Sequence, residues 1–152
     1  MLIKEQIDIH ATPEQVWPFI VDPVIQAVWN PKIVSIERPH DGPVTIGESY
    51  KMIAKMSDKE KIFKVVVADL VEAHRLSFEH QLTEAGTGLT VTETFTLSPR
   101  GHGTRLQQKV DLRQTPIPLL LRPILWLVFR MGKPVGEPQL ATLKRMIESE
   151  LA

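Results

Sequence analysis

The chain has 152 residues, the ordinary length of one domain, and no shift in composition indicates a second, so we expect a single domain over residues 1–152. Its 18 basic and 18 acidic residues give a formal net charge of zero. Nucleic-acid-binding proteins usually carry a basic surplus, so this balance argues against that class. The chain contains no cysteine, which excludes disulfides, thiolate metal sites and cysteine nucleophiles.

The first residues carry charge without the apolar core of a signal peptide, and we therefore expect a cytoplasmic protein. One later stretch, residues 117–131, is nearly continuous apolar sequence interrupted by two prolines and two arginines. A membrane-spanning helix needs about 18 to 20 apolar residues, so this stretch is too short and too broken to be one. Because it is apolar all round, it is expected to line a cavity, to form a homodimer contact, or to be a membrane-facing gate.

The N-terminal third predicts a strand followed by two short helices. Residues 3–9 alternate between apolar and polar side chains, which is typical of a strand with one buried face. Thr12 is a good N-cap, Pro13 suits the first helical position, and Gln15 completes a capping box. The helix is expected to end near the next Asp-Pro pair, where a second short helix begins and continues to Trp29.

Period-two alternation then returns and predicts a series of strands, over residues 33–36, 48–55, 61–71, 75–83, 89–98 and 104–113. The connections are short and rich in turn-forming residues, so neighbouring strands form hairpins and the sheet is antiparallel. Near the end of the chain, apolar residues recur at helical spacing, at Leu140, Leu143, Ile147 and Leu151. Glycines and prolines between residues 132 and 138 are expected to kink this helix or divide it in two.

This order of elements predicts an α+β fold in which a curved antiparallel sheet of six or seven strands wraps around a long, kinked C-terminal helix. Two short helices follow the first strand. One face of such a meander has to be covered, and the C-terminal helix is the long element available to cover it. We expect the space between the sheet and this helix to be an apolar cavity.

Four stretches resemble motifs of the START-like superfamily, also called SRPBCC, which includes birch-pollen-allergen-like proteins, polyketide cyclases and lipid-transfer domains. They are residues 9–17 (IHATPEQVW), 28–35 (VWNPKIVS), 47–50 (GESY) and 72–78 (EAHRLSF). The last of them has Ala73 where the motif usually has proline. The resemblance covers residues 3–150 and implies the helix-grip fold. Because these motifs belong to the scaffold, they identify no particular chemistry.

A few polar side chains share a face with the apolar residues of their strands. Alternation places His80, Glu93 and Gln108 on inward faces, and Tyr50 on the inward face of an earlier strand. Buried polar groups need a partner, and an apolar pocket with a few convergent polar groups is the usual form of a small-molecule site. We expect the cavity to be lined by Trp29, Tyr50, Met52, Leu76, Phe78, His80, Val91, Glu93, Phe95, Leu106, Gln108, Val110, Leu125 and Phe129.

Several of these residues have two interpretations. His80 and Glu93 either contact a ligand, as a catalytic pair in which Glu93 sets the tautomer of the histidine, or hydrogen-bond each other as part of the core. Trp29 either stacks on a ligand at the cavity mouth or anchors the junction between helix and strand. The remaining histidines show no metal-ligand spacing and are expected at the surface: His10, His40, His74 and His102. We expect no metal and no cofactor.

The resemblance implies binding, transport or sequestration of a small hydrophobic ligand such as a lipid, a polyketide or an isoprenoid. A first alternative is a cofactor-independent polyketide cyclase, dehydratase or hydrolase that uses His80 and Glu93. A second is a protein-interaction module, as in relatives that activate a heat-shock chaperone ATPase. The expected partners are a small hydrophobic molecule and, through residues 117–131, a second copy of the chain or a membrane surface; no nucleic acid is expected.

Overall fold

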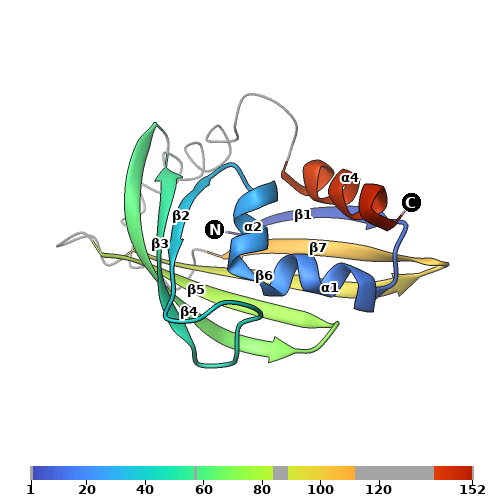
Figure 1. Cartoon of the computed structure of the whole chain (residues 1–152), viewed down its shortest axis with the longest axis horizontal. Helices are drawn as coiled ribbons and strands as arrows, with labels where there is room; N and C mark the ends of the chain where they lie inside the picture. The colour runs from blue at the N-terminus through green and yellow to red at the C-terminus, as the bar shows by residue number, and fades with distance from the viewer. Residues whose placement is uncertain (1, 57, 84–88, 112–138, 152) are drawn as a thin grey trace.

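A seven-stranded antiparallel sheet with three helices on its concave face makes up the described part of the chain (Figure 1). The computed structural model describes residues 2–56, 58–83, 89–111 and 139–151. The strands are β1 (Leu2–Ile9), β2 (Ile33–Glu37), β3 (Ser49–Met56), β4 (Lys59–Val71), β5 (Arg75–Leu82), β6 (Thr90–Arg100) and β7 (Gly103–Asp111). The helices are α1 (Pro13–Val21), α2 (Pro23–Trp29) and α4 (Gln139–Leu151).

The strands lie in the order β1-β7-β6-β5-β4-β3-β2, and every neighbouring pair is antiparallel. Strands that follow one another in sequence are therefore neighbours from β2 to β7, and β1 pairs with the last strand. Each predicted strand is present, with ends that differ from the prediction by one or two residues within the described part of the chain. The predicted antiparallel α+β helix-grip architecture is confirmed.

The start of α1 is held by the predicted capping box. The Thr12 hydroxyl oxygen accepts a hydrogen bond from the backbone N–H of Gln15 at 3.2 Å, and the Gln15 side-chain oxygen accepts one from the backbone N–H of Thr12 at 2.9 Å. Two N–H groups that the first helical turn would leave unpaired are thereby satisfied. This local arrangement fixes where the chain leaves β1 and turns over the sheet.

Trp29 and Gln26 hold α2 against α1. The indole N–H of Trp29 donates to the backbone carbonyl oxygen of Phe19 at 2.8 Å. The side-chain NH₂ group of Gln26 donates to the backbone carbonyl oxygen of Ile20 at 2.5 Å. Trp29 is 1% exposed, and its ring meets the edge of Phe95 on β6 with 6.2 Å between centroids. Of the two interpretations of Trp29, the structure places this residue as the anchor of the helix–strand junction.

The C-terminal helix α4 lies along β1, on the same face of the sheet as α1 and α2 (Figure 1). Three of its predicted core residues are buried, namely Leu140, Leu143 and Ile147. Leu151, in the last turn of the helix, is 46% exposed. The expected kink or division of this helix falls on residues 112–138, which lie outside the described residues.

The turn between β4 and β5 differs from the motif that it resembles. Ala73 has a φ of 59°, in the left-handed region. A proline ring holds φ near −65°, so proline cannot adopt the conformation found here. The alanine is therefore compatible with this turn, whereas the proline of the motif is not.

The capping box gives a direct test of the first helix. Thr12→Ala should lower the free energy of unfolding by about 1 kcal/mol, because the N–H of Gln15 loses its acceptor. Thr12→Ser keeps the hydroxyl and is the matched control, with stability expected within about 0.5 kcal/mol of the wild type. Urea denaturation followed by circular dichroism measures both. Equal losses in the two variants would show that the hydroxyl does not contribute.

Candidate functional site

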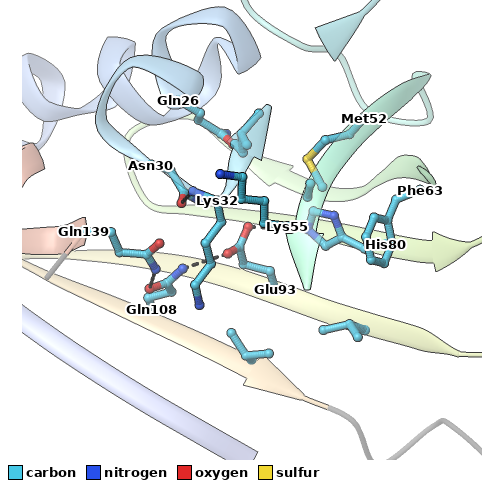
Figure 2. Close-up of a pocket in the computed structure, with 14 residues that line it drawn as sticks. Gln26, Asn30, Lys32, Met52, Lys55, Phe63, His80, Glu93, Gln108 and Gln139 are labelled. Atoms are coloured by element: carbon cyan, nitrogen blue, oxygen red, sulfur yellow. Dashed lines mark hydrogen bonds and ion pairs between the residues drawn. The ribbon is translucent and has the colours of Figure 1, made fainter. Parts of the chain in front are cut away.

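A pocket opens between the concave face of the sheet, the end of α2 and the start of α4 (Figure 2). Its volume is about 140 Å³. An apolar cavity of about 150 Å³ holds a benzene ring in another protein, so the size suits one ring or a short branched chain. The lining residues are Gln26, Asn30, Lys32, Ile33, Met52, Ala54, Lys55, Phe63, His80, Val91, Glu93, Gln108, Val110 and Gln139.

Strand register brings three polar side chains together on the wall of the pocket. Glu93 on β6 lies opposite Phe78 on β5 and Val110 on β7. His80 is two residues beyond Phe78, and Gln108 is two residues before Val110, so both are diagonal neighbours of Glu93 on the same face. The alternation of side chains along each strand, which predicted these inward faces, thus also brings the three side chains close together.

Glu93 is held from both sides. One carboxylate oxygen (Oε1) lies 3.4 Å from Nε2 of His80, and the other (Oε2) accepts a hydrogen bond from Nε2 of Gln108 at 2.7 Å. The Oε1 atom of Gln108 accepts in turn from Nε2 of Gln139, the first residue of α4, at 2.8 Å. The side chains of His80 and Glu93 are 14% and 15% exposed. Figure 2 shows this chain of polar groups running from α4 across β7 and β6 to β5.

The pKa of Glu93 reflects two opposing effects. Burial raises it, but the hydrogen bond and electrostatic interaction with His80, the hydrogen bond from Gln108 and the charge of Lys32 together outweigh burial. The net result is a pKa below the ordinary value of 4.5. Glu93 is therefore an ionised carboxylate at neutral pH, although it lies in a largely apolar pocket.

Six of the residues predicted to line a cavity line this pocket: Met52, His80, Val91, Glu93, Gln108 and Val110. Another six are buried in the core and are not among its lining residues: Trp29, Tyr50, Leu76, Phe78, Phe95 and Leu106. The physical reason is that the concave face is longer than the pocket, and α1, α2 and α4 cover the rest of it. The remaining two, Leu125 and Phe129, and the whole apolar segment 117–131 lie outside the described residues.

Tyr50 lies in a separate environment beside the pocket. It is 6% exposed, and the guanidinium carbon of Arg38 lies 5.9 Å from the centre of its ring. Burial, and then the negative charge of Glu93, raise the pKa of Tyr50 above its ordinary value of 10.0. Arg38 is itself buried and paired with Glu48 at 2.8 Å. The phenol is therefore a neutral part of the core.

The pocket also contains residues that the sequence analysis did not select. Phe63 could have been found, because it alternates with polar residues on β4 and pairs with Met52. Gln139 precedes Leu140 and lies four residues before Leu143, which hints at an inward position. Lys32 lies between α2 and β2 without a periodic pattern, and Lys55 belongs to the outward-facing positions of β3, so neither was identified by alternation. The other four histidines, His10, His40, His74 and His102, are exposed, as expected.

Within the described ranges, no group of three or more His, Cys, Asp or Glu side chains is placed to hold a metal ion. In the same part of the chain, no helix combines the length and the apolar character needed to cross a membrane.

The fold and site together define a helix-grip protein with a small pocket in which a buried carboxylate is surrounded by amides and an imidazole. The chain belongs to the family described as "Polyketide cyclase / dehydrase and lipid transport", which it matches over residues 2–148. A comparison with curated proteins finds no match.

Solved structures support the same architecture. Protein MLL2253 from Mesorhizobium loti aligns with a TM-score of 0.72 at 19% identity and covers 98% of both chains. Ara h 8.0201 aligns with a TM-score of 0.63 at 16% identity, also over 98% of both chains. The Aha1 dimer from Colwellia psychrerythraea gives 0.64 at 14% identity, over 97% of this chain and 96% of that one. At these identities, the likeness shows the fold.

The low pKa of Glu93 predicts a pH-dependent contribution to stability. A carboxylate whose folded pKa lies below its unfolded value stabilises the fold above the unfolded pKa, and that contribution is lost as the pH falls through the folded pKa. The difference in unfolding free energy between the wild type and Glu93→Gln should therefore shrink below pH 4.5. Urea denaturation between about pH 3 and 7 measures it.

Glu60→Gln, at an exposed position on β4, is the matched control for exchanging a carboxylate for an amide. A difference between the wild type and Glu93→Gln that does not change with pH would contradict the assignment of Glu93 as a stabilised carboxylate.

Proposed function

We propose that this protein binds a small, mainly hydrophobic molecule in the pocket between the sheet, α2 and α4. The observation that carries the proposal is the pocket itself, which combines apolar walls with a short chain of buried polar groups. The ligand class we propose is the one that the sequence suggested: a lipid, a polyketide or an isoprenoid. Binding of this kind serves transport or sequestration.

The apolar walls supply the affinity in this proposal. Met52, Ala54, Phe63 and Val91 are each at most 7% exposed and contribute aliphatic or aromatic surface. Burial of apolar ligand surface contributes roughly 25 cal/mol per Å² before the costs of association. A ring or alkyl group that fills the pocket therefore gains its binding energy mainly from leaving water.

The polar groups supply orientation. A carboxylate, two amides and an imidazole converge on one side of an otherwise apolar site, which is the usual organisation of a small-molecule pocket. The family supports the same proposal, because its description joins enzymes that act on polyketides with proteins that transport lipids. Both kinds of molecule are largely apolar and carry a few oxygen atoms.

Filling the pocket should abolish binding. Val91→Trp places an indole where the ligand would lie, and native mass spectrometry of gently purified protein should show the co-purifying apolar ligand reduced by about tenfold or more. Val71→Trp, at a 42% exposed position at the end of β4, is the matched control and should keep its ligand. Far-UV circular dichroism establishes that both variants are folded. A folded Val91→Trp protein with an undiminished ligand would refute binding in this pocket.

A second candidate function is a cofactor-independent reaction on the bound ligand. Its support is the contact between Glu93 and Nε2 of His80, because Nε2 then carries the proton and Nδ1 of the neutral imidazole is free to accept one. In this role His80 is the general base, and Glu93 is a positioning residue that fixes the tautomer. Proton removal from a ligand O–H or acidic C–H is the step that this pair can perform.

The His80→Ala variant distinguishes binding alone from catalysis on the bound ligand. If the protein is an enzyme, this variant should convert the co-purified ligand about 10² to 10⁴ times more slowly while its affinity stays within about threefold. Glu93→Gln should shift the pH profile of the remaining rate. Conversion is followed by liquid chromatography and mass spectrometry. A wild-type protein that returns its ligand unchanged would exclude the second candidate and leave binding as the function.

A further inference from the structure

In the hydrogen bonds along the wall of the pocket, the ionisation of Glu93 determines which group donates and which accepts. An ionised carboxylate can only accept hydrogen bonds. Gln108 must therefore present its NH₂ group to Glu93, which it does at 2.7 Å, and its oxygen is left to accept. Gln139 in turn presents its own NH₂ group to that oxygen at 2.8 Å. The orientation of both amides follows from the charge on one side chain.

With donors and acceptors arranged in this way, the row of polar side chains from Gln139 to His80 has an unpaired acceptor at each end. At the α4 end, the oxygen Oε1 of Gln139 is buried and has no hydrogen-bond partner among the described residues. At the β5 end, Nδ1 of His80 is likewise buried without a partner in that part of the chain. In the neutral form of the imidazole, the nitrogen that faces Glu93, Nε2 at 3.4 Å from Oε1, carries the proton, and Nδ1 then carries the lone pair. Both residues line the same pocket.

A buried acceptor without a partner is unfavourable, and native structures avoid it. Both atoms are shielded from bulk water and line the pocket, so a donor inside the pocket, from a ligand or from an ordered water, is what would satisfy them. We propose that the pocket selects a ligand whose apolar body carries hydroxyl groups, with one O–H donating to Oε1 of Gln139 and a second to Nδ1 of His80. The inference rests on the proposed binding function and specifies the ligand's polar groups.

Other polar groups fit these two positions less well. A carbonyl or ether oxygen only accepts, and it would face another acceptor at either end. A carboxylate would place a second negative charge beside Glu93. An ammonium group would donate, but it would enter a site where the positive charge of Lys32 already acts on Glu93. A neutral hydroxyl, whether phenolic or aliphatic, donates without bringing a charge, and it is the donor that oxygen-bearing apolar molecules carry.

Three ring compounds of nearly equal size test the inference: 4-ethylphenol, 1-ethyl-4-fluorobenzene and 4-ethylbenzaldehyde. They differ in carrying a donor, a weak acceptor and a strong acceptor at the same position. Isothermal titration calorimetry on ligand-stripped full-length protein at neutral pH should give about tenfold or more tighter binding of the phenol than of the fluoro compound. The aldehyde should bind no more tightly than the fluoro compound.

Two variants assign the preference to its acceptors. Gln139→Met removes the oxygen at similar size, and His80→Phe removes Nδ1. Because 4-ethylphenol carries one hydroxyl, which can donate to either acceptor, the double variant should lower the ratio of the two dissociation constants by about threefold or more, with little change for the fluoro compound. Gln107→Met, at the neighbouring position on β7 that faces the other side of the sheet, is the matched control and should keep the wild-type ratio.

The outcomes distinguish the two proposals. Equal binding of all three compounds, or tightest binding of the aldehyde, would overturn the preference for hydroxyl donors and leave hydrophobic binding intact. A phenol preference that survives in the double variant Gln139→Met/His80→Phe would overturn its assignment to these residues. Failure of all three compounds to bind would count against the pocket as a ligand site and against the preference with it.

Discussion

The ionised carboxylate of Glu93 is the constraint on which the rest of the site depends. An ion is costly to place in an apolar pocket, and it persists there because neighbouring groups satisfy it. Those groups come from three elements: His80 from β5, Gln108 from β7 and, through Gln108, Gln139 from α4. The charge therefore orients the amides, sets the tautomer of the imidazole and connects the C-terminal helix to the sheet.

The aromatic core behind the pocket holds these groups in place. Phe95 meets the rings of Trp29 and Phe78 edge to face, with centroids 6.2 and 6.5 Å away respectively. The row continues to His80, whose ring centre lies 6.1 Å from that of Phe78 and 6.4 Å from that of Phe63. The imidazole is thus packed between apolar rings, and its contact with Glu93 is kept by the same core that docks α2 on β6.

Much of the fold and part of the site could be predicted because both depend on short-range patterns. The capping box of Thr12 and Gln15 is a local signal. The inward faces of His80, Glu93 and Gln108 follow from the period of two. Predicting that these faces meet needs the register of three strands, and antiparallel hairpins with short turns make that register nearly determined. For this reason the alternation could place these three residues on one face, where the structure brings their side chains together.

The remaining features depend on how layers meet, which no local pattern encodes. The position of Gln139 over Gln108 depends on where α4 crosses the sheet. The placement of Phe78 and Leu106 beneath the helices depends on how much of the concave face α1, α2 and α4 cover. Lys32 follows the end of α2 in a segment without periodicity, so its approach to Glu93 became visible in three dimensions alone.

The central claim is that Glu93 is an ionised acceptor that sets the direction of its neighbours' hydrogen bonds. An NMR pH titration of its side-chain carboxyl carbon, assigned with Glu93→Gln, tests this most directly. The midpoint should lie below 4.5, and the side-chain NH₂ resonances of Gln108 should shift with the same midpoint as their acceptor is protonated. A midpoint above 4.5, with Gln108 unaffected, would mean that the carboxyl is held in its neutral form and that the direction of the polar chain is set by something else.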